Sequence, residues 1–302
     1  MGSSSTMWGN DRKAQVLDLV PPAMVIAVVA FWWLAPKALV DNSRTIMIVT
    51  IVTVAMILAL EWVHERHVTW RMNWKEFFTD VFYLVLGFTA ISWATDSFAE
   101  NPLKAVKAAL HIHTPFTEHM PFLAQVALVI FLIEFGQYWM HRLMHNVTPF
   151  WLTHAPHHHI TQLNAMKGYV GNPIELFLIS LSVVTLFDFE AAPLFCAFSV
   201  LGVVSGFAHA NVGSNPPIWY SYFFTTIRHH SLHHSVPWED TRCNYANSLI
   251  LIDRVFGTYR EGEGIIVGQD QRKRLTIWEQ FAFPFVPVVR YFRKSGEQTS
   301  AA

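Results

Sequence analysis

The segment EFGQYWMHRLMH, residues 134–145, closes an apolar run that extends from Phe122 to Met140. A run of this length that holds no charge except Glu134 predicts a helix long enough to cross a bilayer. His141 and His145 follow at its end and are four residues apart, so they project from one face of a helix. The fold is therefore predicted to be a membrane bundle that carries histidines at a helix end.

Two further clusters repeat this spacing. In HAPHHH, residues 154–159, the histidines at 154, 157 and 158 have the i, i+3, i+4 spacing of one helix face. In HHSLHH, residues 229–234, positions 230, 233 and 234 have the same spacing, and His209-Ala-Asn211 lies between the two clusters. Eleven of the 16 histidines fall between positions 141 and 234, which makes this region the candidate functional site.

Eight histidines in clusters with ligand spacing, together with His209, indicate metal binding. Buried imidazoles without metal would leave donors and acceptors unsatisfied at a cost of about 1–3 kcal/mol each. Zinc takes four ligands in structural sites and three protein ligands in catalytic sites, so nine imidazoles predict two metals. Imidazole binds iron, zinc, copper and nickel alike, and ligand type alone does not identify the metal. The nine are His141, His145, His154, His157, His158, His209, His230, His233 and His234.

Composition agrees with a membrane protein. The 302 residues are 52% hydrophobic and 14% charged, whereas soluble domains carry about 25% charged residues. The net charge of -1, with no basic block beyond 272–274, argues against nucleic-acid binding. Two cysteines exclude a disulfide framework and a multi-thiolate metal site.

The apolar runs predict an all-α integral membrane bundle. Four of them are read as spans, and the third is the shortest; they are Val20–Leu34, Ile46–Val63, Val81–Ala94 and Phe122–Met140. A shorter pair, 174–187 and 194–207, is predicted to be a re-entrant hairpin or two steep spans. The stretch Leu275–Tyr291, rich in aromatics and interrupted by prolines, is expected at the membrane interface.

The distribution of basic residues predicts the orientation. More basic residues fall on the side of the membrane that carries the histidine clusters than on the opposite side. The first set is Arg12, Lys13, Arg66, Arg71, Lys75, Arg142 and Lys167, and the second is Lys37, Arg44, Lys104 and Lys107. We therefore expect a multi-pass protein with the histidine cluster and both termini in the cytoplasm. One integrated unit, 1–302, is predicted: membrane helices in 16–140, a histidine-bearing region in 141–262 that includes the hairpin 174–208, and a tail in 263–302. The loops and tail would form a cytoplasmic helical cap.

These motifs resemble the fatty acid hydroxylase and sterol desaturase superfamily of membrane di-iron oxygenases, over about Glu134–Tyr259. The likeness extends beyond the histidines to YWMHR at 138–142, Asn164, the H-x-N element at 209–211, Asn244-Tyr245 and DRVFGTY at 253–259. The closing element is most similar to the sterol desaturase and alkylglycerol monooxygenase branches. The chain departs from the usual pattern at 170–172, which reads Val-Gly-Asn, and at Ile252, and His159 and His229 are extra imidazoles.

The resemblance implies that the nine histidines bind two iron ions and that dioxygen is the co-substrate. Asn211 would be a weak or water-bridged tenth position or else a turn residue, and His159 or His229 would compete with neighbouring ligands. Glu134, Glu239 and Asp240 are candidate acceptors for imidazole N–H groups. Asp188 and Asp253 are weaker candidates for that role.

The implied reaction is oxygen-dependent hydroxylation of an unactivated C–H bond in a membrane lipid, such as a fatty acyl chain, a sterol or an ether lipid. Desaturation by the same class of enzyme is the nearest alternative. A histidine-rich metal transporter or metal-binding protein is the alternative from another class, although a transporter needs polar groups inside its spans. The chain has no dinucleotide, haem or iron–sulfur motif, so a separate electron donor is expected: a ferredoxin, a cytochrome or a pterin reductant.

Overall fold

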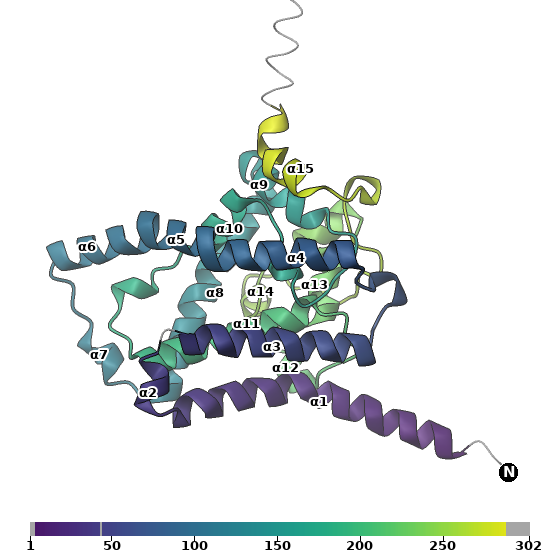
Figure 1. Cartoon of the computed structure of the whole chain (residues 1–302), viewed down its shortest axis with the longest axis horizontal. Helices are drawn as coiled ribbons and strands as arrows, with labels where there is room; N and C mark the ends of the chain where they lie inside the picture. Colours follow the sequence, from purple (N-terminus) through teal and green to yellow (C-terminus); the bar gives the residue numbers. More distant parts are fainter. Residues whose placement is uncertain (1–3, 43, 288–302) are drawn as a thin grey trace, which may run out of the picture.

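A computed structural model describes residues 4–42 and 44–287, and these residues form an all-helical protein without extended strands (Figure 1). The α-helices are α1 (Ser4–Leu34), α2 (Lys37–Val40), α3 (Arg44–Val63), α4 (Trp74–Leu86), α5 (Ser92–Thr95), α6 (Asn101–Ala109), α7 (Pro115–Glu118), α8 (Phe122–Asn146), α9 (Thr148–His158), α10 (Pro173–Ser180), α11 (Ala191–His209), α12 (Ile218–Ser221), α13 (Ile227–His233), α14 (Leu251–Val255) and α15 (Ile277–Ala282). Short helical segments of other geometry include η2 (Gly87–Ile91), η3 (Asp96–Glu100), η4 (Lys167–Tyr169) and η5 (Val184–Leu186).

Five helices of the described chain are long and apolar enough to cross a membrane, which confirms the predicted all-α membrane bundle. They are Gln15–Leu34, Arg44–Val63, Trp74–Ala109, Phe122–Asn146 and Ala191–His209. Large apolar side chains on these helices point outward and are exposed, among them Ile26, Ile51, Phe78 and Phe131. An apolar surface of this kind is typical of helices that face lipid.

Helix α11 lies at the centre of the bundle and packs against α1, α3, α8 and α13. Its buried side chains form the main core with α1 and α8, where Val200 and Val204 lie with Val129 and Ile133. The indole Nε1 of Trp32 on α1 donates a hydrogen bond to Ser199 Oγ at 2.8 Å, which satisfies a polar group inside the bundle. Because α11 ends at His209, this packing also fixes one of the predicted ligands.

Two spans differ from the predicted ones. The third extends through α4, η2, α5, η3 and α6 as one helix of 36 residues, although hydropathy indicated only 81–94. The helix continues past Asp96 and Glu100 because these side chains lie at its surface. Pro102 follows just after the π-helical segment η3, where the regular α-helical hydrogen-bond pattern is already interrupted. The two helices of the predicted short pair differ in length: α10 ends at Ser180 after eight residues, whereas α11 is a full span of 19 residues.

The cap is built from α9, α13, α14, α15 and the loops between them. In Figure 1, α13 and α14 lie on one side of α8, and α6 lies at the far left edge of the view. The aromatic stretch that begins at Leu275 forms α15 and continues to 287, while its remainder, 288–291, lies outside the described residues.

Candidate metal centre

Four helix ends carry the predicted histidines. His141 and His145 lie in the last two turns of α8, and His154, His157 and His158 lie on α9, which begins two residues after α8 ends. His209 closes α11, and the third cluster lies on and just after α13. Thr226 caps α13, with its hydroxyl paired to the ring of His229, and this fixes where the helix starts and which face carries the cluster.

The structure brings all nine histidines together in two adjacent groups. His141, His145, His154, His158 and His233 form the first group, and His157, His209, His230 and His234 form the second. Within each group the available nitrogen atoms lie within 4.8 Å of one another, and all nine residues are buried. The ring of His158 in the first group stacks on His234 of the second with centroids 4.5 Å apart, so the groups share a wall. Each group is able to hold one metal ion.

Backbone carbonyls determine which ring nitrogen faces the centre. The Nδ1 atoms of His141, His157 and His233 donate to the carbonyl oxygens of Tyr245 (2.6 Å), Val170 (2.7 Å) and Cys243 (2.7 Å). His209 Nδ1 donates likewise to the Ser205 carbonyl oxygen at 2.9 Å. A carbonyl oxygen only accepts, so in a neutral ring each Nδ1 carries the proton and each Nε2 keeps a lone pair. These lone pairs are the ones needed for metal binding.

Several of these Nε2 atoms lie too close together to be stable without a cation. His141 Nε2 and His233 Nε2 are 3.1 Å apart, although both rings carry their proton on Nδ1. Two facing lone pairs repel each other unless a positive charge lies between them. Two nitrogens about 2.1 Å from one metal ion and at right angles lie roughly 3 Å apart, so the observed spacing fits a shared metal.

Unpartnered atoms and the electrostatics point the same way. Both ring nitrogens of His145 and Nδ1 of His158, His230 and His234 are buried with no hydrogen-bond partner. Burial lowers the pKa of His154 to about 3, and it lowers the pKa of His233 far below the usual value. The rings are therefore neutral at pH 7, the state in which imidazole binds metal.

The sequence analysis missed Glu175, whose carboxyl group contacts His154 of the first group. Glu175 Oε1 lies 2.6 Å from His154 Nδ1, and both side chains are buried. Glu175 is the N3 residue of a capping box with Asn172 at the start of α10. A Cβ at Gly171 would lie 2.3 Å from Glu175 Oε2, so any larger residue at position 171 would force the carboxylate to shift. The chain departs from the superfamily's pattern at this same segment.

Two buried acids act on the centre through a loop rather than through an imidazole. Asp253 accepts the backbone N–H groups of Tyr245 and Ala246, each at 2.8 Å. Glu134 accepts those of Ser248 and Leu249 at 2.8 and 2.9 Å. Because the Tyr245 carbonyl receives His141 Nδ1, these acids position a ligand indirectly. The predicted direct contact between Glu134 and an imidazole is therefore replaced by a contact with the backbone.

The remaining predicted site residues lie outside both groups. The amide of Asn211 is taken up by the His67 backbone, at 2.8 and 3.0 Å, which favours the turn role over the tenth ligand. His159 Nδ1 pairs with the Lys273 carbonyl oxygen, and His229 is directed at Thr226 and Glu261. Glu239 is exposed and Asp240 forms an ion pair with Arg260. Contrary to the prediction from the sequence, neither residue accepts a hydrogen bond from an imidazole.

Comparisons of the sequence with known proteins find relatives that are lipid hydroxylases, a monooxygenase and a sterol desaturase. Residues 126–258 match the family model for fatty acid hydroxylases. Ornithine lipid hydroxylase OlsE from Rhizobium tropici is 30% identical over 222 residues, which cover 70% of this chain and 66% of that protein. Alkylglycerol monooxygenase from Homo sapiens is 27% identical over 139 residues, 45% of this chain and 31% of that protein. A probable Delta(7)-sterol 5(6)-desaturase from Neurospora crassa is 27% identical over 164 residues, 52% of this chain and 44% of that protein. No solved structure matches.

Proposed function

Because this chain belongs to the fatty acid hydroxylase family, as its histidine motifs indicated, we propose that it hydroxylates an unactivated C–H bond of a membrane lipid with two iron ions and dioxygen. The observation that carries the proposal is the pair of buried histidine groups with facing lone pairs. His141, His145, His154, His158 and His233 would hold one iron, and His157, His209, His230 and His234 the other. When bound, the iron pair supplies the reductive activation of dioxygen that oxidation of such a bond requires.

The chain's own residues orient the ligands and exclude water. The carbonyl oxygens of Tyr245, Val170, Cys243 and Ser205 keep four rings in the metal-binding tautomer. All nine rings are buried, which keeps bulk water away from the reacting carbon. The proposal places this centre and both termini on the cytoplasmic side, in line with the distribution of basic residues. The shorter apolar segment Pro173–Leu186 would then make the sixth crossing beside the five long helices.

Electrons would come from a separate protein or a diffusible reductant, because the sequence carries no motif for a redox cofactor of its own. A ferredoxin, a cytochrome or a pterin are the candidate donors. The purified protein is expected to form no product with NADPH alone and to form product when a donor system is added. Product formed with NADPH alone would contradict this part of the proposal.

Metal content and isotope incorporation test the function directly. Protein purified under low oxygen from iron-supplemented cells is expected to hold about two irons per chain. With membrane lipid, a donor and labelled dioxygen, the product is expected to gain one labelled oxygen atom. A product that only loses two hydrogens would indicate the desaturase alternative, and one metal or none per chain would refute the two-metal centre.

Replacing Glu175 with glutamine is expected to lower metal affinity about 10- to 100-fold, the usual effect of substituting a group that orients a metal ligand, because an amide oxygen is a weaker acceptor than a carboxylate. The change replaces the buried carboxyl group that His154 Nδ1 contacts with an amide but keeps the length of the side chain. Metal titration followed by iron or cobalt absorption measures the effect. Glu279→Gln is the matched control, because Glu279 holds the same capping-box position at exposed α15. Equal affinity in both variants would contradict the role of Glu175.

A further inference from the structure

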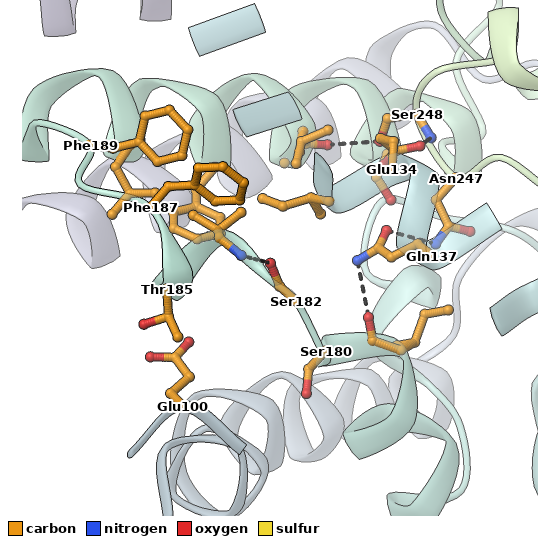
Figure 2. A pocket seen from close by; sticks show the side chains of 18 of the residues that line it. Glu100, Glu134, Gln137, Ser180, Ser182, Thr185, Phe187, Phe189, Asn247 and Ser248 are labelled. Carbon is orange, nitrogen blue, oxygen red and sulfur yellow. Dashed lines mark hydrogen bonds between the residues drawn. The ribbon is translucent and has the colours of Figure 1, made fainter. Parts of the chain in front are cut away.

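A cavity of about 900 Å³ runs through the bundle beside the candidate metal centre. Its walls come from α6, α8 and α11 and from the segment between α10 and α11. Figure 2 shows Glu100 and Thr185 on one side of this space and the amides of Gln137 and Asn247 on the other. The two ends of the cavity therefore differ in their surroundings, and each end has its own chemistry.

The inner end of the cavity lies against His209. Gly168 and Ser205 both line it, and Ser205 provides the carbonyl oxygen that holds His209 Nδ1. A Cβ added at Gly168 would lie 3.2 Å from His209 Cε1. Because position 168 has no side chain, a ligand in the cavity is able to approach the imidazole of His209. Any residue larger than glycine at this position would keep the ligand further away.

The outer end of the cavity is charged. Glu100, Lys104 and Lys107 lie on one side of the last part of the long helix, and Asp188 faces them from the segment before α11. Lys107 is held by Asp188, and this hydrogen bond keeps the pKa of the Asp188 carboxyl at about 2. Lys104 is 3.4 Å from Glu100 and its side chain is 56% exposed, so its ammonium group is available to another anion.

Between the two ends the walls are mostly apolar. Leu194, Phe198, Leu201 and Gly202 line the cavity along α11, and Ile133 and Val184 also line it. From Leu194 to Ser205 the helix rises about 17 Å. This length exceeds half of a hydrocarbon core that is roughly 30 Å thick. A space that is charged at one end and apolar along such a length fits a lipid tail with its head group at the charged end.

We infer that the cavity binds an amphiphile with its anionic head group, a phosphate or a carboxylate, at Lys104 and its apolar tail extended past Gly202 to Gly168. This inference rests on the proposed function and names its substrate class. The head group then lies at the membrane face opposite the cap, and the oxidised carbon lies in the distal part of the tail. Lys104 and Gly202 are binding residues in this arrangement, and Gly168 sets how closely the tail approaches His209.

Photo-crosslinking maps the orientation without any turnover. Two palmitic acid probes are used, one with a diazirine next to the carboxylate and one with a diazirine at the methyl end. They are bound to metal-loaded protein held without oxygen and then irradiated. The carboxylate-end probe is expected to label residues around 104–113, and the methyl-end probe residues around 165–169 and 202–206, as read by peptide mass spectrometry. The reverse pattern, or no labelling of either region by the two probes, would overturn the inference.

Two substitutions test the ends separately. Gly202→Phe fills the middle of the cavity, because a Cβ there meets no atom within 4 Å, and it should abolish labelling at the inner end. Gly136→Phe is the matched control, since Gly136 is exposed on α8 and a Cβ added there also meets no atom within 4 Å.

Lys104→Glu tests the charged end of the cavity and should raise the half-saturating probe concentration at least about 5-fold. Lys75→Glu, at the other end of the same long helix, should leave it unchanged.

The readouts separate this inference from the proposed function. Two irons per chain and labelled product together with a reversed probe pattern would retain the hydroxylase and reject the orientation. Normal probe patterns without oxygen-dependent product would retain the amphiphile site and reject the hydroxylase. Unchanged inner-end labelling in Gly202→Phe, with metal content equal to that of Gly136→Phe, would reject the path of the tail.

Discussion

Replacing His233 with alanine is expected to abolish oxygen-dependent lipid oxidation. His233 Nε2 lies 3.1 Å from His141 Nε2 inside the first group, and its Nδ1 is fixed by the Cys243 carbonyl oxygen. Loss of this nitrogen removes one of five rings and leaves a buried space in its place. The same result is expected for His157→Ala in the second group. Product analysis under labelled dioxygen, with metal content measured on the same sample, checks both variants.

His159→Ala separates loss of a ligand from general damage to the cap. His159 is buried next to His158 but belongs to neither histidine group, and its ring contacts Phe283 instead. This variant is expected to keep about two metals per chain and to retain product formation. Retained product in His233→Ala or His157→Ala would refute the metal assignment. Loss of metal in all three variants would mean that the histidine substitutions act on folding.

The histidine groups could be predicted because their spacing is local. Residues three and four apart share a helix face whatever the rest of the chain does, so the ligand faces of α8, α9 and α13 follow from the sequence alone. The division into two groups does not follow from it. His157 and His158 are adjacent on α9, yet they fall in different groups because neighbouring residues on a helix point in different directions.

The supporting residues could not be found from spacing. Glu175 is 21 residues from His154, and only the capping-box pattern from Asn172 to Glu175 marked it as a fixed carboxylate. Glu239 and Asp240 lie close to the third cluster in sequence, but the segment that carries them turns toward Arg260 at the surface. Contacts between distant segments depend on how the cap folds onto the bundle, and a single sequence does not encode them in a readable pattern.

The long third helix explains why hydropathy alone gave a shorter span. Its far part carries Asp96, Glu100, Lys104 and Lys107, which end an apolar run in any window average. In the structure, Glu100, Lys104 and Lys107 line the charged end of the cavity. Three of the four residues that shortened the predicted span are therefore residues that make one end of the cavity charged.

A second buried network links this helix to the metal centre. Lys167 is 2% exposed, and its Nζ lies 2.6 Å from Glu76 and 2.7 Å from Asp80 on α4. Arg274 also pairs with Glu76, which adds the segment before α15. Lys167 opens η4, which contains Gly168, and Val170, which holds His157, follows directly. By holding η4 in place, the ammonium group of Lys167 therefore positions both the inner end of the cavity and His157, a ligand of the second histidine group.

Lys167→Met is expected to lower the free energy of unfolding by about 3–5 kcal/mol, because removing one partner leaves buried charge uncompensated. Thermal unfolding of the purified protein in detergent measures the loss. Lys167→Met combined with Asp80→Asn should recover much of it, since Glu76 keeps Arg274 as its partner and the unpaired carboxylate is gone. Lys167→Met should also lose metal at the second group, because Val170 no longer holds His157, and the double variant should regain it. A single variant as stable as the parent would show that the network is solvated and does not fix the loop. A double variant less stable than the single one would show that Asp80 stabilises the fold through Asn164, to which it is also bonded, rather than through Lys167.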